Sequence, residues 1–407
     1  MGRFIIRGGK RLGGEISVDG SKNAALPIIF SCILIRGIST LTNVPDIADV
    51  DVALDILKSF GAEHERNGDN IILDTRELSY TEPPDCLVSK IRASSYLIGA
   101  SLGRFGRAKI MRFGGCNFDT RPIDMHLYAA SALGAKVDGD ELFADHLVGA
   151  DIFFNKISVG ATVNAILLAV TAKGKSRIFG YAKEPHVISL IEFLRGGGAE
   201  IQIDEDCISI EGRELNSSGA KIITDMIEAG SYLALSLMTD SSLKIIGADI
   251  DQLDSFLDLL IHSGAVVEFD DASVTVSGRI CDRVNIETAP YPAYPTDLQP
   301  LMAPLLASSF GGTIKETVWQ RRFGYLDELA KFGISFNIFD GYAEINKSQI
   351  RPAKAKAPDL RGGAALLLAA LYAEGESIIE DSEIIKRGYS DVVNKLRAVG
   401  ADIIAVD

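Results

Sequence analysis

The chain has 407 residues, of which 47% are hydrophobic, and a formal net charge of −14. This length and composition are enough for two domains with buried cores, as expected of a soluble globular protein. Nucleic acids and anionic membranes are bound by basic surfaces, so the acidic balance argues against both kinds of partner. An anionic ligand would have to meet a local cluster of Lys and Arg side chains.

The cysteines and the apolar stretches bear on the cellular compartment of the protein. Five cysteines are widely spaced, and no C-x-x-C pair or nearby His suggests a metal site, so reduced thiols in the cytoplasm fit best. The N-terminal apolar run, Phe4–Ile6, is too short for a signal peptide, and the longest apolar stretch, Ala364–Ala373, is too short to cross a bilayer. We therefore expect neither export nor membrane insertion, and no metal or cofactor.

A glycine followed by Ala, or once by Ile, ends an amphipathic segment six times along the chain. In order, these glycines are Gly61, Gly134, Gly198, Gly264, Gly333 and Gly400. Mostly apolar residues four, seven and eight positions before each glycine share one face of a helix. Glycine closes a helix in the left-handed conformation without a Cβ penalty, so each is predicted to be a helix C-cap. Intervals of 64 to 73 residues indicate a repeated supersecondary module.

Each module contains a second, more apolar helix ahead of the amphipathic one. The clearest case is Ala364–Ala373, followed by a strand at Glu376–Glu380, and segments such as Ala199–Ile210 behind the glycines alternate like paired strands. A helix that is apolar on all sides belongs in an interior. The sequence therefore predicts an α/β fold of six βαβαβ-type repeats, three around buried helices in each of two lobes.

The division between the lobes is expected in a polar segment. Arg213–Gly219 lies between the third and fourth repeats. A break there would leave a cleft between two lobes, and clefts of this kind commonly bind ligands.

Charged residues stand close to the predicted helix starts, where backbone N–H groups and the helix dipole favour anions. Three cations come from the first lobe and three from the second: Lys22, Arg92, Arg121, Arg322, Arg361 and Arg387. A single Arg is more simply explained as a solvated surface residue, but six at equivalent repeat positions predict a substrate with several negative charges. Neither a P-loop nor a Rossmann glycine motif is complete, so both kinds of nucleotide site are excluded.

Short motifs are spread along essentially the whole chain. They are Ser21–Pro27 (SKNAALP), Asn43–Pro45 (NVP), Gly114–Cys116 (GGC), Arg121–Asp124 (RPID), Ser158–Thr162 (SVGAT), Pro295–Asp297 (PTD), Asp359–Arg361 (DLR) and Arg387–Tyr389 (RGY). Together they resemble the bacterial UDP-N-acetylglucosamine enolpyruvyl transferases. The chain resembles the 5-enolpyruvylshikimate-3-phosphate synthase branch less, because of its Cys loop and its Lys-Asn pair. The resemblance implies a two-domain inside-out α/β barrel, with 20–225 in the first lobe and 1–19 plus 226–407 in the second.

The same resemblance implies a reaction and its site. The enolpyruvyl group of phosphoenolpyruvate would pass to the 3-hydroxyl of UDP-N-acetylglucosamine with release of phosphate, the first committed step of peptidoglycan precursor synthesis. Cys116 would act as general acid, form an adduct with phosphoenolpyruvate and react with fosfomycin, and Arg121 in its loop can lower a thiol pKa. Asp297 would take the proton of the attacking hydroxyl, so that one acid and one base serve opposite partners.

Further site residues follow from matching motifs. Lys22, Arg121 and Arg387 are expected around the phosphate, with Lys22 counted among the catalytic residues, and Arg322 and Arg361 are expected around the carboxylate. Asn23 is expected at the sugar, and the uridine diphosphate is expected to contact Arg121, Pro122, Asp124, Lys156, Ser158, Val159 and Gly160. Further substrate contacts are expected from Arg92, Asp297 and Val318. Two structural alternatives stay open: Cys116 could be an apolar filler, and Asp297 could be a helix N-cap, although Thr296 could also fill that role. His126 falls on an apolar helix position and is expected to be a hydrogen-bonded core residue.

Four segments near the expected cleft depart from the family pattern and leave the acceptor open. They are Lys183–His186, Asp225–Glu228, Trp319–Arg322 and Ile384–Tyr389. The alternatives are a paralogous enolpyruvyl transferase acting on another nucleotide such as UMP, and a catalytically silent regulator that binds UDP-sugars.

Overall fold

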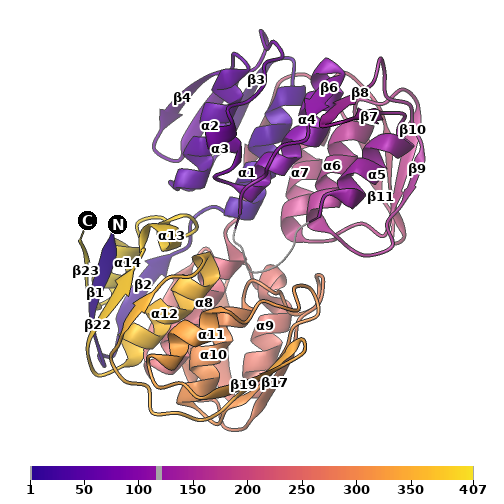
Figure 1. The fold of residues 1–407 in the computed structure, drawn as a ribbon. Coiled ribbons are helices and arrows are strands. Elements are labelled where there is room, and N and C mark those ends of the chain that lie inside the picture. The colour runs from indigo at the N-terminus through magenta and orange to yellow at the C-terminus, as the bar shows by residue number, and fades with distance from the viewer. Residues whose placement is uncertain (1, 116–121, 407) are drawn as a thin grey trace. The chain divides into compact units, whose positions relative to one another are not determined.

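The computed structural model describes residues 2–115 and 122–406, and contacts divide the chain into two compact units (Figure 1). Within the described residues, the first lobe comprises 20–115 and 122–223 and the second lobe 2–19 and 224–406. Each lobe has three sheets on the outside and three helices inside, as the repeats predict.

The first lobe is built from repeats one to three. Its inner helices are α1 (Lys22–Ser31), α4 (Leu97–Phe105), which follows the 3-10 helix η2 (Arg92–Tyr96), and α6 (Val159–Ala169); its outer helices are α2 (Ala48–Ser59), α5 (Asp124–Ala132) and α7 (Pro185–Gly196). Its sheets have the orders β13 (Ser218–Lys221), β3 (Ile38–Thr42), β5 (Asn70–Asp74), β4 (Glu63–Asn67); β6 (Arg107–Lys109), β8 (Glu141–Phe143), β7 (Lys136–Asp138); and β11 (Glu200–Ile203), β12 (Cys207–Glu211), β10 (Lys175–Phe179), β9 (Asp151–Phe153). The middle sheet has three strands, because the chain before η2 forms the short helix α3 (Asp85–Val88).

The second lobe repeats this plan with repeats four to six. Its inner helices are α8 (Met226–Met238), α10 (Gln299–Ser308) and α12 (Leu360–Tyr372); its outer helices are α9 (Ile250–His262), α11 (Tyr325–Ala330) and α14 (Val392–Ala398), with the short α13 (Glu383–Lys386) before the last. Its sheets have the orders β15 (Ala265–Asp270), β16 (Ser273–Gly278), β14 (Ser242–Ile246), β2 (Gly13–Ser17); β17 (Val284–Glu287), β18 (Gly312–Lys315), β20 (Tyr342–Ile345), β19 (Phe336–Phe339); and β21 (Lys354–Lys356), β22 (Gly375–Glu380), β1 (Arg3–Gly8), β23 (Asp402–Val406).

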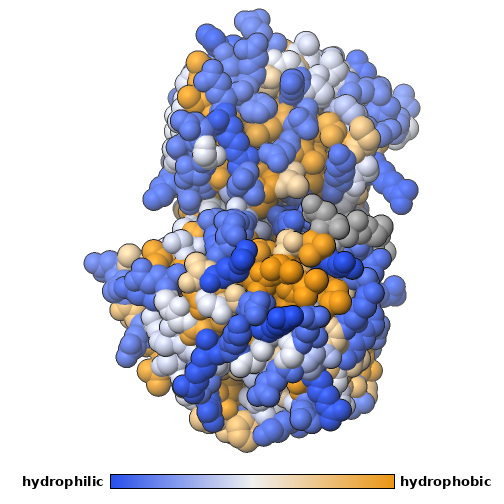
Figure 2. Space-filling model, turned by 90° about the vertical axis from the view of Figure 1, so that its left-hand side faces the viewer, coloured by the Kyte–Doolittle hydropathy of each residue, from blue (hydrophilic) through white to orange (hydrophobic). Residues whose placement is uncertain are grey.

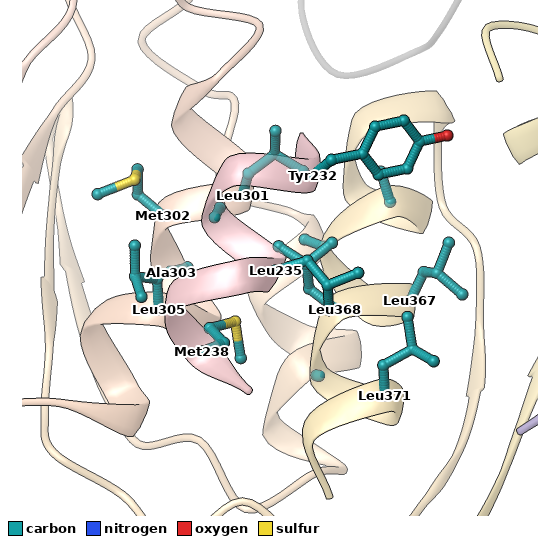
Figure 3. Close-up of a cluster of buried hydrophobic side chains, with 14 of the residues drawn as sticks. Tyr232, Leu235, Met238, Leu301, Met302, Ala303, Leu305, Leu367, Leu368 and Leu371 are labelled. Atoms are coloured by element: carbon teal, nitrogen blue, oxygen red, sulfur yellow. The ribbon is translucent and has the colours of Figure 1, made fainter. Parts of the chain in front are cut away.

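Burial explains why the helices lie inside. Every residue of 161–169 in α6, 227–238 in α8 and 360–371 in α12 is buried. In the second lobe, side chains of α8, α10 and α12 such as Leu235, Leu305 and Leu368 pack against one another (Figure 3). Strands such as β3 alternate between buried and exposed residues, so one face covers the helices and the other meets solvent. The fold is therefore an inside-out α/β barrel in each lobe.

Two strands are exchanged between the lobes. Strand β2 precedes α1 of the first lobe but pairs in parallel with β14 of the second, and β13 precedes α8 of the second lobe but pairs in parallel with β3 of the first. Strand β1 also joins the second lobe, where it lies antiparallel between β22 and β23 and brings the N- and C-terminal strands side by side (Figure 1).

The break expected at Arg213–Gly219 is wrong. Residues 218–221 form β13, whose register with β3 runs from Ser218 opposite Ser39 to Lys221 opposite Thr42. The division between the units follows Ile223 instead. Asp225 lies on the second-lobe side of that division, because its side chain caps α8.

The six repeat glycines are helix caps, as predicted. All have positive φ, between +86° and +103°. At Gly61, its N–H donates to the carbonyl of Lys58 over 2.9 Å and the N–H of Ala62 donates to that of Leu57 over 3.2 Å, which is the Schellman pattern. Each glycine therefore ends an outer helix and starts the turn into the following strand.

The face shown in Figure 2 is largely hydrophilic, with one contiguous hydrophobic patch in the lower half of the view and smaller hydrophobic areas elsewhere. Among the described helices, none has both the length and the apolar character needed to cross a membrane.

Candidate active site

Three aspartates lie at the starts of the inner helices of the second lobe, and two of them cap their helices while the third does not. Asp225 accepts from the N–H groups of the second and third residues of α8, at 2.8 and 3.2 Å, and Asp359 caps α12 in the same way, with both distances 3.0 Å. In α10 the N-cap position is taken by Leu298, and Asp297 lies one residue before it. The N-cap alternative for Asp297 is therefore wrong.

Asp297 instead pairs with two buried arginines. Its Oδ1 lies 2.7 Å from Nη1 of Arg322 and its Oδ2 lies 3.4 Å from Nε of Arg361. Both guanidinium side chains are only 3% exposed, whereas the Asp297 side chain is 31% exposed. The carboxylate is thus held between two cations while part of its own side chain remains exposed.

Arg361 is held at the start of α12 by its neighbours. Burial lowers its pKa, but Asp297 and Tyr389 outweigh burial and raise the pKa above the ordinary value. Its guanidinium lies over the Tyr389 ring, 5.7 Å from the centroid, and the Tyr389 hydroxyl lies 2.7 Å from Ser231 Oγ in α8. The beginnings of α8, α10 and α12 thus converge on one cluster within the second lobe.

In the first lobe, Lys22 and Asn23 open helix α1. The Nζ atom of Lys22 lies 3.2 Å from Oδ2 of Asp49 in the first turn of α2, and the two side chains are 15% and 5% exposed. Asn23 is half-buried beside it. Lys22 is therefore oriented by a buried carboxylate at the start of the neighbouring helix.

Helix α6 is tied to α5, η2 and α4 through Asn164, which the sequence analysis missed. Its Nδ2 lies 2.8 Å from Nδ1 of His126 in α5 and 3.2 Å from the carbonyl of Ser95 in η2, and its Oδ1 accepts from the N–H of Gly99. The prediction for His126 is confirmed: it is a buried, hydrogen-bonded core residue. Burial, and then the charge of Arg92, lower its pKa to about 4, so the ring is neutral near pH 7.

The remaining predicted residues of the first lobe lie at or near these helix starts. Ser158 caps α6 through its Oγ, which accepts from the N–H of Ala161 over 3.4 Å, and Val159 and Gly160 form the first turn of that helix. Lys156, Pro122 and Asp124 are exposed. Arg92 opens η2, and burial lowers its pKa.

Two further predicted residues lie away from the inner-helix starts, and two others are not described. Val318 is half-buried in the turn after β18, and Arg387 is half-buried after α13. Cys116 and Arg121 fall outside the described residues. In 2–115 and 122–406, no group of three or more His, Cys, Asp or Glu could hold a metal ion.

Comparison with known proteins gives matches over the whole chain. The family described as EPSP synthase (3-phosphoshikimate 1-carboxyvinyltransferase) matches residues 6–396. The UDP-N-acetylglucosamine 1-carboxyvinyltransferase 2 of Streptococcus mutans serotype c is 38% identical, with 100% of both chains covered. The UDP-N-acetylglucosamine 1-carboxyvinyltransferase of Halothermothrix orenii is 39% identical, with 99% of both covered.

Solved structures agree on the fold. The enolpyruvyl transferase NikO from Streptomyces tendae has a TM-score of 0.89 and 26% identity, covering 100% of this chain and 99% of its own. EPSP synthase from Acinetobacter baumannii, at a TM-score of 0.74 and 15% identity with full coverage of both chains, shares the fold. By sequence over its whole length and by architecture, the chain belongs to the EPSP synthase family of enolpyruvyl transferases.

Proposed function

We propose that the chain transfers the enolpyruvyl group of phosphoenolpyruvate to the 3-hydroxyl of UDP-N-acetylglucosamine and releases phosphate. The observation that carries this proposal is the end-to-end match, at 36–39% identity, to proteins named UDP-N-acetylglucosamine 1-carboxyvinyltransferase. The product would be a peptidoglycan precursor, made in the cytoplasm.

The second lobe supplies a group suited to the first step. Addition of the hydroxyl across the double bond forms a C–O bond at C2 and a C–H bond at the methylene carbon, so one proton is removed and one delivered. Asp297, paired with Arg322 and Arg361, is proposed to accept the hydroxyl proton. Cys116 is proposed as the acid on the resemblance alone.

The second step reverses the protonation and expels phosphate. Loss of a proton from the new methyl group restores the double bond as the C2–O bond to phosphate breaks, which leaves the enolpyruvyl ether. Lys22, Arg121 and Arg387 are proposed to contact the phosphate and Arg322 and Arg361 the carboxylate. Cations at these sites would stabilise charge that develops as the phosphate leaves.

The nucleotide is proposed to bind to the first lobe at the start of α6. Helix N-termini favour phosphates, and Lys156 lies exposed just before the Ser158 cap. Asn164 and His126 hold this turn against η2 and α5. Asn23 is proposed to contact the sugar.

Phosphate release distinguishes the acceptors. Wild-type protein is incubated with phosphoenolpyruvate and UDP-N-acetylglucosamine, UMP or no acceptor, and phosphate is followed with time. We expect sustained release only with UDP-N-acetylglucosamine. Release only with UMP would show that UMP, and not UDP-N-acetylglucosamine, is the acceptor. Binding of both substrates without phosphate release would identify the protein as a silent regulator.

Reaction with fosfomycin tests the role of Cys116 separately. After incubation, peptide mass spectrometry is expected to find one adduct, on Cys116. Cys86 and Cys281 are exposed free thiols and serve as controls within the chain for nonspecific alkylation. An unmodified Cys116 in folded, active protein would contradict its proposed role.

A further inference from the structure

Glu316 is a buried carboxylate directly behind the Asp297 cluster. It is 1% exposed and follows strand β18. Its Oε1 accepts hydrogen bonds from Thr288 Oγ1 over 2.7 Å and from the N–H groups of Val318 and Trp319, each over 2.9 Å. Its Oε2 accepts from the Thr296 hydroxyl over 2.8 Å. The two oxygens therefore have separate tasks: one holds the turn at 317–319, and the other holds Thr296.

The bond from Thr296 to Glu316 fixes which way the hydroxyl points. Because the hydroxyl proton is directed at Glu316, the oxygen presents its lone pairs to other donors. Nη1 of Arg322 lies 3.0 Å from this oxygen and 3.0 Å from the Thr296 carbonyl oxygen. The same nitrogen lies 2.7 Å from Oδ1 of Asp297. A continuous path of hydrogen bonds thus runs from Glu316 through Thr296 and Arg322 to Asp297.

We propose that Glu316 is a positioning residue that sets Arg322, and through it Asp297, by orienting the Thr296 hydroxyl. Buried behind Thr296, it acts through this relay and does not touch substrate. The inference rests on the proposed function, in which Asp297 accepts a proton and Arg322 contacts the carboxylate of phosphoenolpyruvate. Such support matters because small displacements of reacting groups can reduce rates by up to about 10²-fold.

Two substitutions separate the relay from the turn. In Glu316→Gln, the amide oxygen can keep the three bonds at Oε1, while the amide N–H₂ takes the place of Oε2. The N–H₂ group is a donor, so it cannot accept the proton of the Thr296 hydroxyl, whose oxygen already accepts from Arg322. The hydroxyl proton thus loses its acceptor, and the hydroxyl is no longer held in its orientation. Thr296→Val removes the hydroxyl while keeping a similar shape. Thr313→Val is the control, because Thr313 donates to Asn285 Oδ1 on the same sheet away from Asp297.

The test is a double-mutant cycle on steady-state phosphate release. We expect kcat to fall about 10-fold or more in E316Q and in T296V, with T313V at the wild-type value. The double variant is expected to be no slower than the slower single variant, because both break one path. The relay would be overturned if the fold-reduction of kcat in the double variant equalled the product of the two single reductions. It would also be overturned if kcat in either single variant stayed within about 2-fold of wild type.

A binding readout separates failure of the relay from failure of the proposed function. Isothermal titration calorimetry measures phosphoenolpyruvate binding without turnover. If wild-type protein releases no phosphate, the proposed reaction fails, but the relay still predicts weaker phosphoenolpyruvate binding in E316Q and T296V than in T313V. Equal binding by all three would overturn the relay whatever the acceptor is. Melting temperatures of the variants identify any loss of fold.

Discussion

The two lobes share one repeat but start their inner helices differently. In the first lobe, α1 and η2 begin at Ser21 and Ile91, which make no side-chain capping bond, and Ser158 caps α6 over 3.4 Å. In the second lobe, Asp225 and Asp359 cap α8 and α12 at 2.8 to 3.2 Å. An aspartate cap already satisfies N–H groups that an anion would use. In the second lobe the N-termini of α8 and α12 are therefore already occupied and only α10 among the described inner helices lacks a side-chain cap, whereas in the first lobe only α6 has one.

The lobes also bury titratable groups with opposite pH behaviour. His126 in the first lobe is kept neutral by burial and by Arg92. In the second lobe, burial raises the pKa of Glu228 to about 7, although Lys395, 2.7 Å away, opposes the shift. Tyr232 and the backbone N–H of Asp19 donate to the same carboxylate over 2.8 Å. The same repeat therefore buries a neutral His in one lobe and a carboxylate in the other, and the stability of the two lobes should depend on pH in opposite directions.

The largest expected effect is that of Asp297→Asn, which tests the special role of the uncapped second-lobe helix. It removes the proposed proton acceptor and nearly preserves shape, so kcat for phosphate release should fall by roughly 10²- to 10⁴-fold. The melting temperature should also fall, because the neutral amide leaves Arg322 and Arg361 buried without their carboxylate, so kcat is compared at a temperature at which the variant is folded. A kcat within a few-fold of wild type would remove Asp297 from the mechanism.

Next in size is the pH dependence of the first lobe. The folded pKa of His126, about 4, is below its ordinary 6.5, so the unfolded chain binds the proton more tightly. The free energy of unfolding is therefore highest above pH 6.5 and falls as the pH is lowered towards 4, by at most about 1.4 kcal/mol per pH unit. Hydrogen exchange of α6 amides, corrected for intrinsic rates, should show this loss in wild type and not in His126→Gln. Equal slopes in the two proteins would refute it.

The stability of the second lobe should change with pH in the opposite direction. The folded pKa of Glu228 is above its ordinary 4.5, so stability is greatest below pH 4.5 and is lost as pH rises to about 7. The slope is again at most about 1.4 kcal/mol per pH unit. Exchange of α8 amides should report it, and Glu228→Gln should flatten it without affecting α6. If stability of α8 instead rises over this range, the carboxylate is not desolvated as described.

The smallest effects concern the caps themselves. Asp359→Ala should lower the free energy of unfolding by about 1 kcal/mol, and Asp359→Asn by much less, because Asn also caps helices. Ser158→Ala should lower it by about 0.5 kcal/mol, because the first-lobe cap bond is long. Denaturant unfolding measures all three. Equal losses at Asp359 and Ser158 would contradict the difference between the lobes.

The repeat, the helix caps and the inside-out arrangement could be predicted from sequence, because periodicity and Gly positions are local signals. The six glycines and the buried α12 segment are examples. The break inferred from polar composition at Arg213–Gly219 was misplaced, because only the pairing of β13 with β3 shows that this stretch completes the first lobe. The resemblance placed the division after residue 225, close to where the contacts place it, after Ile223. A polar composition does not distinguish a linker from an edge strand.

The supports of the site could not be predicted. Glu316 and Asn164 act through partners 20 to 69 residues away in sequence, and no spacing marks them. Asp359 stood in a motif, but its capping role depends on where α12 begins. Helix starts are uncertain by a few residues in sequence reasoning, and a cap is fixed by a single residue.

The most direct test of the central claim is the identity of the nucleotide product. Purified protein is incubated with phosphoenolpyruvate and UDP-N-acetylglucosamine, and the nucleotide is examined by mass spectrometry and proton NMR. We predict a UDP-N-acetylglucosamine that has gained one enolpyruvyl group on the 3-hydroxyl, in amounts equal to the phosphate released. Unchanged UDP-N-acetylglucosamine in the presence of folded protein that binds both substrates would contradict it.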